Sequence, residues 1–280
     1  MDWQIIDHLI DLALAEDLPA GDITTEAVIK EEAMARAIFQ AKQDGVLAGI
    51  EVAARVFLKL DSGVEFIRKL EDSQEFKSGQ VLAEVRGRAA SLLKGERTAL
   101  NFLQRLSGIA SLTRSFVEAT RGTGAIILDT RKTTPGWRQL EKYAVRMGGG
   151  TNHRMSLSDM MLIKDNHIRL AGGISPALER AREFLKSRNL TNIKIEVETT
   201  SLAEVREALE NGADWIMLDN MPMEEIKAAV KLVSGRVPVE VSGRVSLQNI
   251  RQLALAGVNY ISVGALTHSF RSADISLEFL

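Results

Sequence analysis

From residue 124 onward, short apolar runs alternate with amphipathic helical patterns, and this alternation constrains the fold more than any other feature of the sequence. Six runs read as strands, at residues 125–129, 160–164, 193–198, 215–219, 237–242 and 260–264. Helical patterns follow the later runs, at residues 201–213, 222–234 and 246–258. Strands that alternate with helices predict right-handed βαβ units and a parallel sheet. We therefore expect an incomplete (β/α) barrel, with a doubly wound open sheet as the competing α/β architecture.

The first part of the chain has a different pattern. Strand-like runs and helical stretches mix there, with strands at 35–42, 64–70 and 80–87 and helices at 3–16 and 49–60. From Ser91 to about Thr120 the pattern is helical, and a break is expected near Ser107 and Gly108. No Pro- or Ser-rich linker occurs, so the sequence predicts two closely joined domains, 1–107 and 108–280, with the last residues packing back on the first domain.

Composition and charge narrow the functional classes. The chain of 280 residues has a net charge of −2 and no cysteine, which excludes disulfides, thiolate metal ligands and a cysteine nucleophile. Its longest apolar runs are too short to span a bilayer, and the acidic N-terminus lacks signal-peptide features. We therefore expect no binding to membranes, and the absence of cysteine fits a cytoplasmic protein. We also expect no binding to nucleic acid, because no basic arm occurs.

Positive charge is nevertheless concentrated in one stretch. Residues 129–169 hold eight Lys or Arg against four Asp or Glu, a net of +4, so the rest of the chain carries −6. Arg131 and Lys132 precede a helical pattern at 134–148, and Arg154 follows a glycine-rich loop. Two or three arginines can hold a planar dianion through paired N–H bonds, although an ordinary solvated loop is the alternative. The stretch favours a small anionic ligand.

Each of the six strand-like runs ends in a polar residue or glycine, namely Asp129, Lys164, Glu198, Asp219, Ser242 and Gly264. In a parallel barrel these ends converge on one rim, where such enzymes place their sites. The alternative for any single residue is that it only terminates its strand. The set as a whole predicts an active site at that rim.

Neighbouring carboxylates and glycine-containing turns suggest what the rim binds. Glu198 and Asp219 end two consecutive strands, an arrangement suited to Mg²⁺ or ribose hydroxyls. The segments 241–246 and 262–266 place small residues before a helix or turn, where backbone N–H groups can reach a phosphate. His153 could orient an anion, although a packed histidine is as good an interpretation.

The other three histidines give less indication of a functional role. His167 and His268 are favoured as packed or exposed residues, and His8 as helix surface. No HxxxH or HExxH spacing occurs, so a zinc site is not expected.

Taken together, these motifs resemble the quinolinate phosphoribosyltransferase family. The resemblance rests on "GDITT", "GERTALNFLQRLSGIAS", "LDTRKTTPG", "EKYAVRMGGGTNHR", "LIKDNH", "IEVE", "MLDN" and "ISVGALTHS", which cover nearly the whole chain in order. It implies an N-terminal α/β sandwich domain before the incomplete barrel, and a homodimer or larger assembly whose subunits share active sites. It also implies a decarboxylating pentosyltransferase of NAD biosynthesis. Such an enzyme converts quinolinate and phosphoribosyl pyrophosphate to nicotinate mononucleotide, pyrophosphate and carbon dioxide, with Mg²⁺.

The resemblance also implies roles for individual residues. Arg131, His153 and Arg154 would hold the two quinolinate carboxylates. Arg97 would reach the substrate from the neighbouring subunit. The implied catalytic residues are Lys132, Lys164, Glu198 and Asp219. Glu198 and Asp219 would also bind the ribose and Mg²⁺, directly or through water or substrate. The 5′-phosphate would be held by Ser242, Gly243 and Gly264.

The chain departs from the family pattern at Arg244, where the family usually has a second glycine after Ser242 and Gly243. Three rival functions remain open at this point. One is an aldolase-type enzyme with a Schiff base on Lys164, which would need an apolar setting for the amine. The second is a non-catalytic phosphosugar-binding protein. The third is a relative acting on a monocarboxylate such as nicotinate, which suits the Arg131, His153 and Arg154 set less well than a dicarboxylate.

Overall fold

The computed structural model describes residues 1–280, which form two compact units. The first unit contains Met1–Arg114, Thr133–Gly149 and Leu266–Leu280, and the second contains Ser115–Lys132 and Gly150–Ala265. The units therefore interleave along the chain, and the last residues belong to the first unit. No helix has the length and apolar character needed to cross a membrane.

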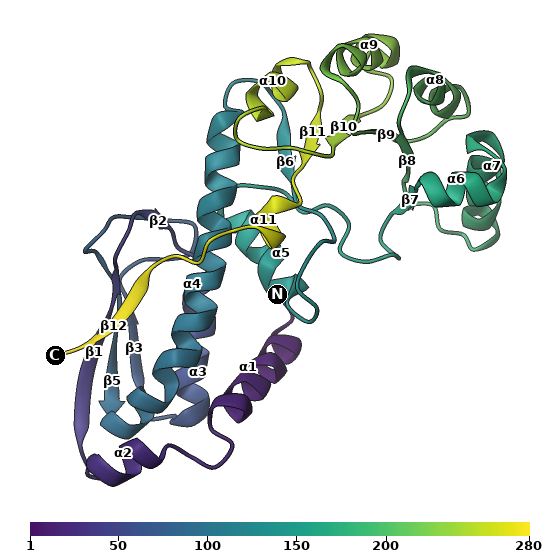
Figure 1. Cartoon of the computed structure of the whole chain (residues 1–280). Coiled ribbons are helices and arrows are strands. Elements are labelled where there is room, and N and C mark those ends of the chain that lie inside the picture. Colours follow the sequence, from purple (N-terminus) through teal and green to yellow (C-terminus); the bar gives the residue numbers. More distant parts are fainter. The chain divides into compact units, whose positions relative to one another are not determined.

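An antiparallel four-stranded sheet forms the base of the first unit (Figure 1). Its spatial order is β12 (Ile275–Phe279), β1 (Met34–Ala41), β5 (Val81–Arg88) and β3 (Glu65–Arg68). The C-terminal strand β12 pairs with β1 over five residue pairs, so the end of the chain completes the sheet begun near its start. A two-stranded ribbon, β2 (Gly45–Val46) and β4 (Glu75–Phe76), adds to the unit.

Helix α3 (Ile50–Leu60) covers this sheet because its apolar residues recur on one face. Phe57 from this helix packs at 6.1 Å from Phe39 of β1, and Phe66 of β3 completes the aromatic cluster. Fully burying a phenylalanine contributes roughly 1.5–3 kcal/mol, so the cluster is a major stabilising contact of the unit. The unit's other helices are α1 (Trp3–Asp17), α2 (Ile23–Val28), α4 (Ala89–Ala119), α5 (Arg138–Met147) and α11 (Ala265–His268), with α4 and α11 extending across the unit boundaries.

Helix α4 runs without interruption through Ser107 and Gly108, so the expected break there is wrong. Gly108 serves close packing instead, since a Cβ at this position would stand 2.2 Å from the carbonyl oxygen of Arg271. The Ser107 hydroxyl also lies inside the unit and accepts a hydrogen bond from the Ala48 N–H at 3.1 Å. Glycine marks a close approach of two backbones here, and the helix tolerates it.

Helix α5 begins at Arg138 and not at Pro135, where the sequence suggested its start. The Thr134 N–H donates to the buried carboxylate of Glu141 at 3.1 Å, and Arg105 donates to both the Thr134 hydroxyl and Glu141. These bonds hold residue 134 outside the helix. The expected C-terminal end is confirmed, because the Gly148 N–H caps the helix on the Ala144 carbonyl at 3.0 Å.

The second unit is built on a parallel six-stranded sheet. Its spatial order is β6 (Ile126–Leu128), β11 (Tyr260–Ser262), β10 (Val239–Ser242), β9 (Trp215–Asp219), β8 (Ile195–Thr199) and β7 (Met161–Ile163). Five strands consecutive in sequence are consecutive neighbours in space, as in a barrel, whereas a doubly wound sheet reverses its order at a switch point. Strands β6 and β7 do not pair with each other, so the barrel is incomplete as predicted.

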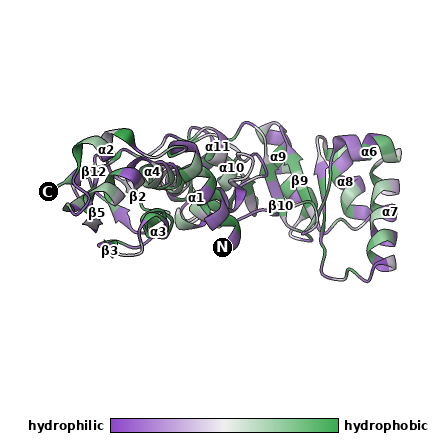
Figure 2. Cartoon of the chain, turned by 90° about the horizontal axis from the view of Figure 1, so that it is seen from below, coloured by the Kyte–Doolittle hydropathy of each residue, from purple (hydrophilic) through white to green (hydrophobic).

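Helices cover the outer side of this curved sheet (Figure 1). They are α6 (Asp165–Ala171), α7 (Ile174–Ser187), α8 (Leu202–Glu210), α9 (Met223–Val233) and α10 (Ile250–Leu255). Helices α7 and α9 carry both hydrophobic and hydrophilic stretches (Figure 2), as expected for helices with one face against a sheet. The opposite, inner side of the sheet is left to the residues that form the candidate site.

Candidate active site

The polar residues predicted at the strand ends lie along one edge of the second unit's sheet. Glu198, Asp219 and Ser242 occupy the last or next-to-last positions of β8, β9 and β10. Asp129 and Lys164 directly follow β6 and β7, and Gly264 follows β11 by two residues. Parallel pairing throughout the sheet places all these strand ends at the same edge.

Lys164 and Glu198 form an ion pair across the neighbouring strands β7 and β8. The Lys164 Nζ donates to Glu198 Oε2 at 2.5 Å. The Lys164 backbone N–H also donates to Nδ1 of His167 at 3.0 Å, which fixes the first turn of α6. His167 thus has a structural contact at the site's edge. The carboxylate partner of Lys164 argues against the Schiff-base rival, which needs an amine in apolar surroundings.

Asp219 is linked to the loop after β10 through Asn220. The Asn220 side-chain amide donates to Asp219 Oδ2 at 2.8 Å, and its backbone N–H donates to the Ser242 carbonyl at 3.0 Å. A Cβ on Gly243 would stand 2.3 Å from the Asn220 amide oxygen, and Gly243 has a φ of +90°. Only glycine fits this turn without displacing Asn220.

Arg244, the residue that departs from the family pattern, is exposed and has a left-handed backbone with φ of 50°. Its carbonyl accepts a hydrogen bond from Asn249 Nδ2 at 2.9 Å, and Asn249 Oδ1 accepts from the Ser246 N–H at 2.9 Å. The Asn249 side chain therefore holds the turn that follows Gly243. Backbone N–H groups of such a turn are available for an anion.

Asp129 joins the two cationic loops. It is fully buried, accepts from the His153 N–H at 2.9 Å, and accepts from Asn152 Nδ2 at 2.5 Å. A parallel bridge between Leu128 and Thr151 supports the same contact. Asp129 follows β6 at the rim as expected, but its side chain is fully buried and holds the segment that carries His153.

Arg131 and Arg154 form the cationic part of the site. Burial lowers the pKa of Arg154, and the nearby Arg131 guanidinium lowers it further, whereas Glu196 and Asp159 oppose the change. One Arg154 nitrogen, Nη1, donates to the Met160 carbonyl at 3.1 Å. Two guanidiniums held near each other in a half-buried setting repel, and an anionic ligand relieves that repulsion.

The His153 side chain belongs to a buried cluster with Glu196 and Glu240, two residues that were not predicted from the sequence. Its Nε2 is 3.0 Å from Glu196 Oε2 and 3.5 Å from Glu240 Oε2. Burial alone would lower the pKa of His153, but the two carboxylates outweigh it and raise the pKa to about 9. Burial and the charge of Glu240 raise the pKa of Glu196 to about 7.

Glu196 and Glu240 could have been found from the sequence. Each lies two residues before a predicted site residue, in "IEVE" and "VEVS", and strand periodicity puts residues two apart on the same face. A charged residue in the middle of a short buried strand was the signal. The prediction of site residues covered only the ends of these strands.

The two other predicted cations are placed separately. Lys132 is exposed in the second unit, and its backbone N–H donates to the Thr130 hydroxyl at 3.0 Å. Arg97 is exposed on α4 in the first unit. Their roles in catalysis and binding stay predictions.

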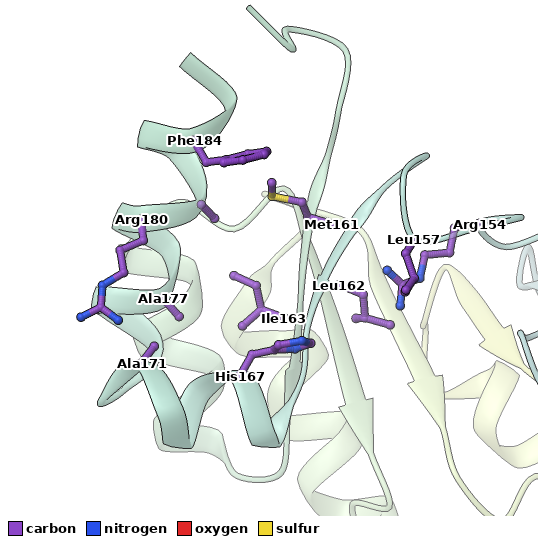
Figure 3. A pocket seen from close by; sticks show the side chains of 11 residues that line it. Arg154, Leu157, Met161, Leu162, Ile163, His167, Ala171, Ala177, Arg180 and Phe184 are labelled. Carbon is purple, nitrogen blue, oxygen red and sulfur yellow. The ribbon is translucent and has the colours of Figure 1, made fainter. Parts of the chain in front are cut away.

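A pocket of about 510 Å³ lies between β7 and α7 (Figure 3). Its lining is mainly apolar and includes Met161, Ile163, Ala177 and Phe184, while the Arg180 guanidinium points away from it. Arg154 is the one predicted site residue in its lining, and none of the carboxylates at the strand ends lines it. It does not have the chemistry of a site for a polyanionic substrate.

Two groups of side chains have the ligand atoms that a metal ion could use. Glu198 and Asp219 offer carboxylate oxygens at the carboxyl ends of neighbouring strands, and Asp219 Oδ1 accepts no hydrogen bond. This set suits Mg²⁺, which prefers oxygen ligands, keeps several waters and is often held by one or two carboxylates plus phosphate. The second group, His153, Glu196 and Glu240, brings its ligand atoms within 4.8 Å of one another, but its side chains are buried and its imidazole nitrogen Nε2 already pairs with both carboxylates.

An open parallel barrel with arginines, a lysine and carboxylates at one edge defines an enzyme of the α/β-barrel class with an anionic substrate. Residues 22–107 match the N-terminal domain and residues 109–278 the C-terminal domain of quinolinate phosphoribosyl transferase. The chain therefore belongs to the quinolinate phosphoribosyltransferase family.

Individual relatives agree with this assignment. The probable nicotinate-nucleotide pyrophosphorylase (carboxylating) of Bacillus subtilis is 43% identical over 270 residues, covering 96% of this chain and 92% of the relative. The chloroplastic enzyme of Arabidopsis thaliana with the same activity in its name is 45% identical over 288 residues, covering 96% and 81%. The structure of the nicotinate-nucleotide pyrophosphorylase from Francisella tularensis superposes with a TM-score of 0.95 at 39% identity, covering 100% of this chain and 98% of that one.

Proposed function

We propose that this enzyme transfers the phosphoribosyl group of phosphoribosyl pyrophosphate to quinolinate and releases pyrophosphate, carbon dioxide and nicotinate mononucleotide, a step of NAD biosynthesis. The observation that carries the proposal is the pairing of Arg131 and Arg154 beside His153, at the same sheet edge as Lys164, Glu198 and Asp219. Quinolinate carries two carboxylates, and a group of fixed cations matches it better than it matches a monocarboxylate.

In this proposal Arg131, His153 and Arg154 hold quinolinate with its ring nitrogen facing C1′ of the ribose. Lys132 and Lys164 contact the two substrates. Glu198 and Asp219 accept hydrogen bonds from the ribose hydroxyls and hold Mg²⁺, directly or through water or substrate. The turn at Ser242 and Gly243, together with Gly264, binds the 5′-phosphate through backbone N–H groups.

The reaction balances without any redox partner. The ring nitrogen gives its electron pair to C1′ as the bond from C1′ to the pyrophosphate oxygen breaks. The pyridine ring becomes cationic, so the carboxylate next to the nitrogen leaves as carbon dioxide, its electron pair stays on the ring carbon, and that carbon takes a proton. The protein positions the two substrates and stabilises charge, and bound Mg²⁺ would neutralise the departing pyrophosphate.

Arg97 belongs to the same proposal through the assembly. We expect a homodimer or a larger assembly in which the exposed Arg97 of one subunit completes the site of its neighbour. The cytoplasmic location stays a prediction of the sequence.

The test is an assay of nicotinate mononucleotide and carbon dioxide with purified enzyme, Mg²⁺ and phosphoribosyl pyrophosphate, with quinolinate and nicotinate compared as acceptors. Equimolar formation of both products from quinolinate, and none from nicotinate, is the expected result. Turnover of nicotinate alone would instead support the monocarboxylate rival. Binding of phosphoribosyl pyrophosphate without turnover of either acid would support the non-catalytic rival.

A further inference from the structure

Two glutamates in the middle of the second unit's sheet have no part in the mechanism above. Glu196 of β8 and Glu240 of β10 have fully buried side chains. They come from alternate strands on either side of β9, and each lies one layer below a residue of the rim, Glu198 or Ser242. Buried carboxylates are costly, so their presence in a barrel interior calls for a physical reason.

Both carboxylates converge on the imidazole of His153, whose side chain is only 7% exposed. Glu196 Oε2 and Glu240 Oε2 lie 3.0 Å and 3.5 Å from the same ring nitrogen, Nε2. The Ser262 hydroxyl donates to the other oxygen of Glu240 and so orients that carboxylate.

Aromatic packing and a backbone bond restrict the same ring further. The ring of Trp215 lies 6.2 Å from the His153 ring and stacks on Tyr260 at 4.3 Å. The backbone N–H of His153 is held by Asp129. The residue is thereby held through its backbone and one ring nitrogen, with the Trp215 ring beside its imidazole.

Glu196 also acts on Arg154, the neighbour of His153 in sequence. Its negative charge favours the charged form of Arg154, against the effects of burial and of Arg131. One buried carboxylate thus supports two of the three groups proposed to bind quinolinate.

We propose that Glu196 and Glu240 are positioning residues, which hold the His153 ring in the geometry that accepts a quinolinate carboxylate. They do not touch the substrate, and Ser262 orients Glu240 through its hydrogen bond. This inference rests on the proposed function, because the geometry it explains is that of the quinolinate-binding groups. It assigns roles to three residues outside the set expected at the strand ends.

The test compares Michaelis constants for the two substrates in Glu196→Gln and Glu240→Gln, which keep the shape of the side chain but remove its charge. Each should raise the quinolinate constant by at least about tenfold and leave the phosphoribosyl pyrophosphate constant within about twofold. In a His153→Ala background, Glu240→Gln should change the quinolinate constant by less than about twofold, since the ring it positions is gone. The inference would be overturned if Glu240→Gln and His153→Ala raised the quinolinate constant additively. It would also be overturned if the glutamine variants changed the Michaelis constants for both substrates equally.

A matched control is Glu84→Gln. Glu84 is also a strand glutamate with a buried side chain, but it pairs with Arg36 and Arg86 in the first unit's sheet. Its replacement should lower thermal stability without separating the two Michaelis constants. A quinolinate-selective effect of Glu84→Gln as large as that of Glu240→Gln would show that loss of any buried carboxylate suffices, and would contradict the proposal.

Ser262→Ala keeps both carboxylates and is the milder variant if the glutamine variants fold poorly. It should raise the quinolinate constant about two- to threefold, with the phosphoribosyl pyrophosphate constant unchanged, because Glu240 loses one hydrogen bond. An unchanged quinolinate constant with a lowered melting temperature would contradict a positioning role. Absence of quinolinate turnover in the parent enzyme would refute the proposed function itself, whereas an active parent with unselective variants would refute this inference alone.

Discussion

Lys164 donates to Glu198 across the carboxyl ends of β7 and β8, while Asp219 on the next strand keeps one carboxylate oxygen, Oδ1, without a hydrogen bond. The two predicted Mg²⁺ ligands therefore differ in how easily their carboxylates can bind a cation. Glu198 already shares its charge with an ammonium group. Asp219 can offer an oxygen to a cation without breaking an ion pair.

We predict from this difference that Asp219→Asn raises the Mg²⁺ concentration required for half-maximal turnover more than Glu198→Gln does, by at least about tenfold against the parent. Removal of divalent cations with EDTA should abolish turnover, and added Mg²⁺ should restore it. The measurement is a Mg²⁺ titration of initial rates at saturating substrates. Full activity in EDTA would show that the reaction does not need the cation.

The arginine pair gives the second prediction. Arg131→Ala or Arg154→Ala should remove most quinolinate turnover and leave the fold intact, because each loses a charge-assisted contact worth roughly 2–4 kcal/mol, or about 30- to 1000-fold. Steady-state kinetics check the loss, and circular dichroism checks the fold. Parental turnover in either variant would show that the residue does not hold the dicarboxylate.

The strand and helix alternation was enough to predict the second unit. All six expected strands of 125–264 form and pair in parallel, because the chain alternates short apolar runs with amphipathic helices. The barrel stays incomplete, since β6 and β7 do not pair with each other. The helix break expected near Gly108 was wrong. Its role depends on the backbone of Arg271, which is remote in sequence, so no local pattern could distinguish close packing from a helix break.

The site was predicted in part for the same reason. Glu198, Asp219 and Ser242 end parallel strands, so topology alone brings them to one edge. The contacts of Asp129 and His153 depend on how two loops fold onto each other, and sequence spacing contains no such information. Glu196 and Glu240 were missed because only strand ends were read, although their period of two with the rim residues was visible.

The shared site gives the third prediction. Subunits with Arg97→Ala and subunits with Lys132→Ala should each be inactive alone and regain about a quarter of parental activity after mixing, because about half the dimers are mixed and one of the two sites in each is intact. Native mass spectrometry confirms the exchange of subunits. Inactivity of the verified mixture would place both residues in one chain's site.

The protonated His153 gives the fourth prediction. The folded chain keeps the His153 proton up to a pKa of about 9, whereas the ordinary value is 6.5, and the groups that face the ring are Glu196 and Glu240. The stability contributed by this proton is complete below pH 6.5 and is lost as the pH rises through 9, up to roughly 3 kcal/mol in all.

Urea unfolding of the parent and of His153→Gln at several pH values tests the sign. The difference in the free energy of unfolding between the two should be largest near pH 6 and should shrink as the pH rises through 9. A difference that grows with pH would mean that His153 is neutral in the folded chain.

Arg244 gives the last prediction. Its side chain is exposed and its backbone is left-handed, a conformation that costs a non-glycine residue about 1–2 kcal/mol. The Asn249 side chain shapes the turn through the Arg244 carbonyl and the Ser246 N–H, contacts that do not need a guanidinium. Arg244→Gly should therefore change the Michaelis constant for phosphoribosyl pyrophosphate less than about threefold, under roughly 0.7 kcal/mol, and should not lower the melting temperature. A rise of tenfold or more in the Michaelis constant for phosphoribosyl pyrophosphate, with the quinolinate constant unchanged, would instead identify Arg244 as a phosphate ligand. This chain would then have that ligand in place of the usual glycine.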